Sequence, residues 1–126
     1  MARKLALVIG NSQYQDACLA KLTAPEVDVR ELVDTLQSPN IGNFDEVVPL
    51  LNEDCATVRR AIARFFDARS RDDLLLLYFS GHGVRDDHGH LYLAVRDTER
   101  DLLSGTAIEA SFVTARMDRS LSLIHI

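Results

Sequence analysis

Two continuous apolar runs, with amphipathic segments between them, set the pattern of this chain. Leu5 to Ile9 and Leu74 to Phe79 contain no charged residue, which is typical of parallel strands buried on both faces. Apolar side chains recur between them at helical spacing, at Val29, Leu32, Val33 and Leu36 and again at Val58, Ile62, Phe65 and Phe66. The resulting β-α-β-α-β order predicts an α/β fold, with a largely parallel sheet and helices on both faces.

Local signals place the ends of these elements and the remaining ones. Thr23 and Glu26 have the spacing of a capping box, and Asp54 offers an N-cap oxygen to the second helix. Residues 44–51 predict a strand in which Pro49 indicates a sheet edge or the end of the strand. A turn at 86–89, a short strand at 91–94 and a last helix at 111–118 follow. We expect the two apolar runs to be neighbouring central strands, both mostly buried.

Composition narrows the class of protein without naming an activity. The chain has 126 residues, of which 47% are hydrophobic, and a formal net charge of -5. One domain is expected, and the acidic balance disfavours nucleic acid as a partner. No apolar run approaches the roughly 20 residues of a membrane span, so we expect a cytoplasmic protein without a membrane partner. Two cysteines, irregularly spaced, predict neither a disulfide framework nor a zinc site.

The segment Ser80-Gly81-His82-Gly83 directly follows the most apolar run. A histidine there lies at the rim of a parallel sheet, where open α/β sheets place their active sites. Imidazole transfers protons near neutral pH, and flanking glycines leave room for a substrate backbone. These features favour a catalytic His82 over a structural histidine that merely caps the strand.

These residues resemble a known family. Leu7 to Asn11 with Tyr14, the helix that contains Asp28, and Tyr78 to Gly83 together resemble the caspase-like cysteine peptidases, most closely the bacterial metacaspase branch. The resemblance implies a Rossmann-like three-layer sandwich that hydrolyses peptide or protein substrates by a His/Cys dyad. It makes His82 catalytic and assigns the backbone N–H of Gly83 to the oxyanion hole.

The resemblance also bears on specificity and cofactors. It implies no cofactor, with calcium dependence left open, and a preference for basic residues before the cleaved bond. An acidic pocket would explain that preference, and Asp16 and Asp28 are only weak candidates for it.

The nucleophile of that family has no counterpart in the sequence. Its cysteine follows the histidine by about 50 residues, which is beyond residue 126. The segment 121–126 looks like the translation of a sequencing-library adapter, so we expect it to be a non-native tail. Residues 1–120 would then be the amino-terminal, large-subunit part of a peptidase that is inactive as written. The full-length protein could carry further fused carboxy-terminal domains. The sheet would lack its final strand, although residues 123–126 are apolar enough to add to that edge.

Several alternatives stay open. Cys18, or Cys55 at a helix start, could replace the missing nucleophile. A metal could bind at His88 and His90 with Asp86 and Asp87, although a solvated hairpin turn explains these residues more simply. The whole chain could instead be a non-catalytic caspase-like module that binds a protein partner, or, with less support, a nucleotide-binding α/β domain.

Overall fold

The computed structural model describes residues 2–119 and 124–125. Its main sheet is formed by β1 (Lys4–Gly10), β2 (Glu46–Leu51), β3 (Leu74–Ser80) and β7 (Ile124–His125), and its smaller sheet by β4 (Gly83–Arg85), β5 (Leu91–Leu93) and β6 (Ile108–Glu109). The helices are α1 (Ala24–Gln37), α2 (Cys55–Phe65), the 3-10 turn η1 (Arg100–Leu102), α3 (Leu103–Thr106) and α4 (Ala110–Arg119).

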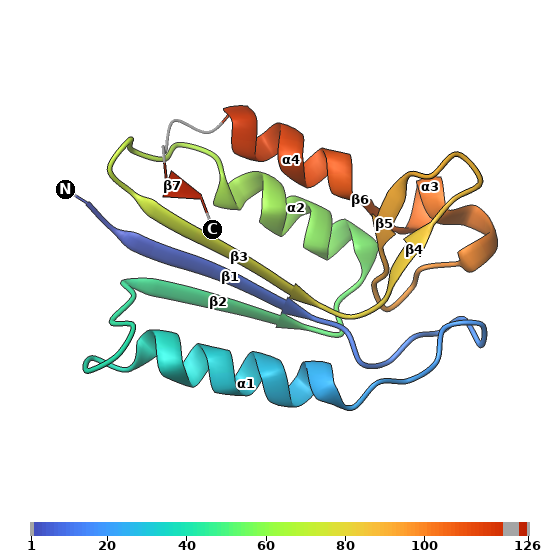
Figure 1. Ribbon diagram of the computed structural model, residues 1–126, viewed down its shortest axis with the longest axis horizontal. Helices are drawn as coiled ribbons and strands as arrows, with labels where there is room; N and C mark the ends of the chain where they lie inside the picture. The colour runs from blue at the N-terminus through green and yellow to red at the C-terminus, as the bar shows by residue number, and fades with distance from the viewer. Residues whose placement is uncertain (1, 120–123, 126) are drawn as a thin grey trace.

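The main sheet has the strand order β2-β1-β3-β7, and each neighbouring pair is parallel. Figure 1 shows α1 beneath this sheet and α2 and α4 above it. The predicted α/β sandwich of three layers, with helices on both faces, is therefore confirmed. The two apolar runs are neighbours, as expected, because β1 pairs with β3 along its length.

The alternation of side chains along β1 divides the core into two halves. Leu5, Leu7 and Ile9 pack toward α2 and α4, together with Val58, Ile62 and Phe65 of α2. Ala6 and Val8 face the other way, toward Val29 and Leu36 of α1. Each residue from Leu5 to Ile9 is at most 2% exposed, which explains why this strand tolerates no polar position.

The second apolar run is less completely buried than the first. Leu75 of β3 is buried, and the other residues of this strand are half-buried. Among the described residues, β7 pairs with β3 at Leu74 and Leu75 alone. The expectation that both runs are neighbouring central strands and mostly buried is confirmed, with β3 less fully covered than β1.

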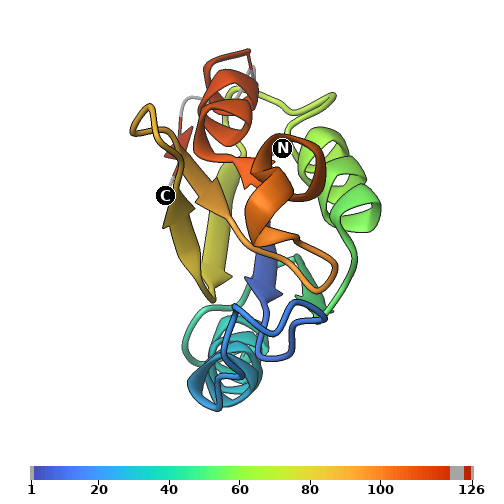
Figure 2. The same ribbon diagram turned by 90° about the vertical axis from the view of Figure 1, so that its right-hand side faces the viewer.

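The smaller sheet stands at one end of the molecule, next to the carboxyl ends of β1 and β3. Figure 2 views it from that end, with the β4–β5 hairpin beside η1 and α3. Its strands are antiparallel, in the order β4-β5-β6. The expected turn is present, with the Asp86 carboxylate accepting the backbone N–H groups of His88 and His90 at 2.9 Å.

The N-cap predicted for α2 is present, whereas the capping box predicted for α1 is not. Asp54 caps α2 by accepting the Thr57 N–H at 2.8 Å. Thr23 occupies the N-cap of α1 but makes no side-chain cap hydrogen bond, so the predicted capping box is not formed. Its backbone is in the right-handed helical region rather than the extended region that aims an N-cap side chain at the helix. Glu26 instead forms an ion pair with Arg30 at 2.8 Å.

The carboxy-terminal segment is described in part. Ile124–His125 forms β7, so the expectation that residues 123–126 add to the edge of β3 is confirmed for these two positions. The other residues of the expected non-native tail, 121–123 and 126, lie outside the described residues. Among the described helices, none has the length and apolarity needed to cross a membrane.

Candidate active site

His82 follows β3 at the point where the strand order of the main sheet reverses. Strand β1 has β2 on one side and β3 on the other. The chain therefore builds the sheet outward from β1 first in one direction, to β2, and then in the other, to β3. This is the switch point at which open α/β sheets bind ligands. The ends of the two strands are joined directly, because the Asn11 N–H donates to the Ser80 carbonyl at 2.9 Å.

The loop that follows β1 holds the half-buried His82 through two of its residues, Tyr14 and Ala20. His82 Nε2 is 2.8 Å from the carbonyl oxygen of Ala20. Its backbone N–H donates to the Tyr14 hydroxyl at 3.0 Å, and the two rings lie 5.0 Å apart. A carbonyl can only accept a hydrogen bond, so Nε2 carries the proton and Nδ1 of the neutral ring keeps its lone pair. The arrangement therefore leaves Nδ1 as the basic atom.

The glycines on either side of His82 serve different purposes. A Cβ on Gly81 would come within 2.9 Å of the Tyr14 hydroxyl, so this glycine permits a close approach. Gly83 is exposed and would place a Cβ no closer than 3.4 Å, to Leu91. Ala94 N donates to the His82 carbonyl at 2.9 Å, which makes Gly83 and Leu93 a non-hydrogen-bonded pair. The N–H of Gly83 therefore points away from β5.

Neither cysteine is hydrogen-bonded to His82 in the described part of the chain. Cys18 is exposed, on the same loop as Ala20, with its backbone N–H bonded to Asp16 at 2.8 Å. Cys55 begins α2 and packs against the core. Burial raises the pKa of the Cys55 thiol, and the nearby Arg59 offsets this only in part. The net shift of the Cys55 pKa is therefore upward, which disfavours the thiolate.

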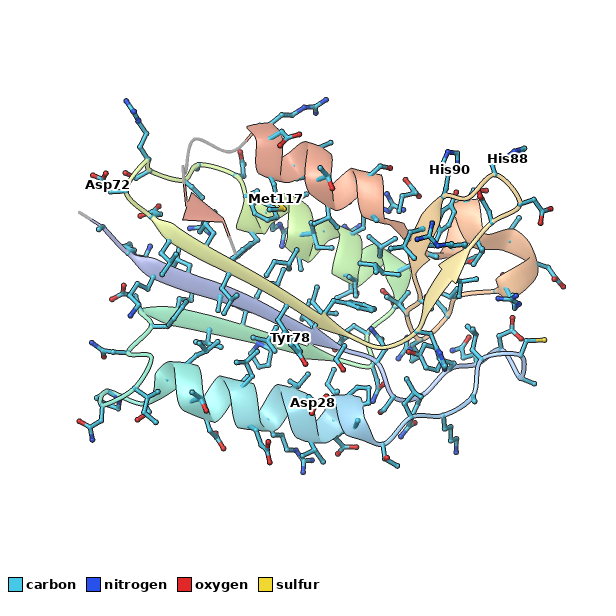
Figure 3. The ribbon with its side chains drawn as sticks, in the orientation of Figure 1. Asp28, Asp72, Tyr78, His88, His90 and Met117 are labelled. Carbon is cyan, nitrogen blue, oxygen red and sulfur yellow. The ribbon has the colours of Figure 1, made fainter. Side chains whose placement is uncertain are left out.

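The two acidic candidates are separated. Asp28 on α1 has Oδ2 3.4 Å from Ser80 Oγ, and Figure 3 shows it beneath the sheet. Asp16 accepts the backbone N–H groups of Arg100, at 2.7 Å, and Cys18, and these bonds lower its pKa. Asp16 also lines a cleft of about 560 Å³, together with Gln15, Asp97, Thr98, Glu99, Asp101 and Thr106. The loop that touches His82 therefore borders an acidic cleft.

The hairpin histidines are remote from this arrangement. Figure 3 shows His88 and His90 at the tip of the β4–β5 turn, away from the sheet. His90 Nδ1 lies 3.3 Å from Asp86 Oδ2, and the two imidazole centroids are 6.3 Å apart. The residues that the structure describes contain no group of three or more side chains suited to hold a metal.

Sequence reasoning missed Tyr14 and Ala20 as partners of His82. Tyr14 entered only as part of the family resemblance, and a backbone carbonyl such as that of Ala20 has no sequence signature. One signal could have pointed to the contact with Tyr14. A glycine directly before a functional histidine indicates that some other group approaches its backbone closely, and here that group is the Tyr14 hydroxyl.

Comparison with known proteins agrees with this architecture. A search of curated proteins gives no match. Among solved structures, pro-sf-caspase-1 superposes with a TM-score of 0.60 and 15% sequence identity, over 92% of this chain. The match spans 38% of the length of that chain, and at this identity it shows a shared fold. The family model described as caspase domain matches residues 3–122. This protein therefore belongs to the caspase domain family.

Proposed function

We propose that this chain is the amino-terminal, histidine-bearing part of a caspase-like cysteine endopeptidase of the metacaspase branch. The observation that carries the proposal is the tautomer of His82. The Ala20 carbonyl occupies Nε2 at 2.8 Å, which keeps Nδ1 available as a base at the switch point of the sheet. Family membership supports peptide-bond hydrolysis on a protein substrate.

In the proposed mechanism, Nδ1 of His82 takes the proton from a cysteine thiol, and the thiolate attacks the scissile carbonyl. The imidazolium that forms keeps its Nε2–H bond to Ala20 and later donates the Nδ1 proton to the leaving amine. The N–H of Gly83, which points away from β5, stabilises the tetrahedral oxyanion. Loss of one such donor costs about 10²–10³ in rate.

The nucleophile in this proposal is a cysteine outside residues 1–126. Cys18 is not hydrogen-bonded to His82, and burial raises the pKa of Cys55, so neither thiol is poised for attack. We further propose that a basic substrate residue enters the cleft lined by Asp16, Asp97, Glu99 and Asp101. The excess of carboxylates there complements an arginine or lysine side chain.

The test begins with the coding sequence that follows Ser120 at its source. An apolar strand followed by Asp-Cys-x-x-Gly is expected, and a protein extended through it should cleave peptides with Arg or Lys before the bond. Residues 1–126 alone should cleave none, and His82→Ala should abolish cleavage by the extended protein. An uninterrupted reading frame without such a cysteine contradicts the enzyme and supports a non-catalytic interaction module. Activity of residues 1–126 that Cys18→Ala or Cys55→Ala removes would identify one of those thiols as the nucleophile.

A further inference from the structure

Tyr14 makes three contacts around His82 from the loop that follows β1. Its hydroxyl accepts the backbone N–H of His82 at 3.0 Å and donates to the Asn11 carbonyl at 2.8 Å. Its ring lies against the imidazole, with centroids 5.0 Å apart and planes tilted by 52°. One side chain thus touches both the backbone and the ring of the histidine, and it ties them to the end of β1.

The position before the histidine is shaped to admit this hydroxyl. A Cβ on Gly81 would lie 2.9 Å from Tyr14 Oη, and 3.3 Å from both the Asn11 carbonyl and the Phe79 ring. Distances below 3.0 Å are not tolerated between a real Cβ and another heavy atom, so Tyr14 or the His82 loop would have to shift. The observed position of the Tyr14 hydroxyl therefore requires a residue without a Cβ at position 81.

The hydroxyl keeps the same charge across the range in which an imidazole titrates. Burial raises the pKa of Tyr14 above that of a free phenol, and the bond from the His82 backbone offsets this only in part. A neutral hydroxyl can accept one hydrogen bond and donate another at once. The link between His82 and Asn11 therefore persists whether the imidazole is neutral or protonated.

We propose that Tyr14 is a positioning residue for His82. Its hydroxyl fixes the His82 backbone against Asn11, and its ring sets the plane of the imidazole so that Nε2 meets the Ala20 carbonyl and Nδ1 stays free. The consequence for catalysis rests on the proposed peptidase function, whereas the placement itself is measurable in residues 1–126. Tyr14 also packs against the small cluster of Leu19, Val84 and Ala94. The test must therefore separate the positioning of His82 from this purely structural packing.

Tyr14→Phe separates the two roles, since it keeps the ring and removes the hydroxyl. The readouts are amide hydrogen exchange at His82 and the nitrogen chemical shifts of its imidazole, which report the tautomer. We expect exchange at His82 to accelerate about tenfold, the effect of one lost hydrogen bond, and the Nε2–H tautomer to lose population. Tyr78→Phe is the matched control, because Tyr78 packs toward α1 on the lower side of the sheet (Figure 3). Unchanged exchange and tautomer in a folded Tyr14→Phe protein would overturn the proposal.

A double-mutant cycle with Gly81→Ala tests the same contact from the other side. Gly81→Ala should disturb the imidazole signals of His82 and leave those of His88 and His90 in place. It should be less destabilising in the Tyr14→Phe background, because the hydroxyl that its Cβ would meet is gone. Equal effects of Gly81→Ala in both backgrounds contradict the proposal. If Tyr14→Phe does not fold, Gly81→Ala alone decides, and unaltered His82 signals refute it.

These readouts do not depend on a nucleophile, so the two proposals can fail separately. In an active extended protein, Tyr14→Phe is expected to lower kcat about tenfold with little change in KM. If the extended protein is inactive with Tyr14 in place, the peptidase proposal fails while the exchange and tautomer data still decide the role of Tyr14.

Discussion

The loop that presents Tyr14 and Ala20 to His82 is anchored at its base by Asn52, directly after β2. Asn52 Oδ1 accepts the backbone N–H groups of Ser12 at 2.8 Å and Gln13 at 3.0 Å, and Nδ2 donates to Ser12 Oγ at 3.2 Å. Asn52 itself has a φ of 57°, in the left-handed region that asparagine tolerates better than most residues. Substitution of Asn52 therefore tests how the site is held.

Asn52→Ala removes the side-chain oxygen that accepts both backbone N–H groups, and it places alanine, which has no compensating side-chain bond, in the left-handed region. Two lost hydrogen bonds cost roughly 1–3 kcal/mol, and the backbone conformation adds about 1–2 kcal/mol. We expect the free energy of unfolding to fall by about 2–5 kcal/mol, a large share of the stability of an ordinary domain. Urea denaturation followed by circular dichroism measures the loss.

Two further variants divide this loss into its parts. Asn52→Gly also lacks the side-chain acceptor, but glycine adopts the left-handed conformation without strain. The glycine variant should therefore be more stable than the alanine variant by about 1 kcal/mol, after allowing for the extra freedom of glycine in the unfolded chain. Asn52→Asp keeps an acceptor for Ser12 and Gln13 and should lose least. The reasoning is refuted if alanine is no worse than glycine, or if aspartate is as destabilising as alanine.

Two other expectations concern stability. A Cβ on Gly42 would lie 2.6 Å from Leu36 Cα, so Gly42→Ala should lower the melting temperature clearly, whereas Gly105→Ala, whose nearest neighbour is 3.8 Å away, should leave it almost unchanged; similar melting temperatures for the two variants would contradict this. Hydrogen bonds from the backbone of Thr57 to Asp54 and of Arg100 to Asp16 hold both carboxyl pKa values below their usual range. A depressed pKa stabilises the fold above the unfolded value near 4, and this contribution is lost as pH falls through the folded value. The urea concentration at the midpoint of unfolding should therefore decrease as the pH is lowered below about 4, and it should decrease less in Asp54→Asn. A midpoint that does not change with pH would count against these bonds.

The sequence was sufficient for features that depend on continuous patterns. The uninterrupted apolar run from Leu5 to Ile9 fitted a strand covered on both faces. Pro49 cannot donate to a ladder, so it favoured a sheet edge or a strand end, and β2 lies at the edge. Helical spacing at Val58 and Ile62 likewise placed α2 over the sheet. These elements are set by periodicity and burial, which a single sequence displays.

Features that depend on contacts between distant segments were not accessible in the same way. The capping box failed because the backbone angles of Thr23, rather than its identity, decide whether the hydroxyl reaches the helix. The lesser burial of β3 relative to β1 depends on which segments cover it, and no local pattern encodes that. The role of the Ala20 carbonyl escaped because every residue carries such a group, and only the folded loop brings this one to His82.

The arrangement around His82 draws one contribution from each of the three strands β1, β2 and β3. The loop after β1 supplies Tyr14 and the Ala20 carbonyl, Asn52 after β2 anchors that loop, and β3 ends at the histidine itself. Because these strands are adjacent in the sheet, their carboxyl ends meet without help from β7. In the part of the chain that the structure describes, His82 is held by hydrogen bonds with Tyr14, Ala20 and Ala94. A cysteine delivered by another segment would find the proposed base already in its working tautomer, and would have to bring only its own thiol into reach of Nδ1.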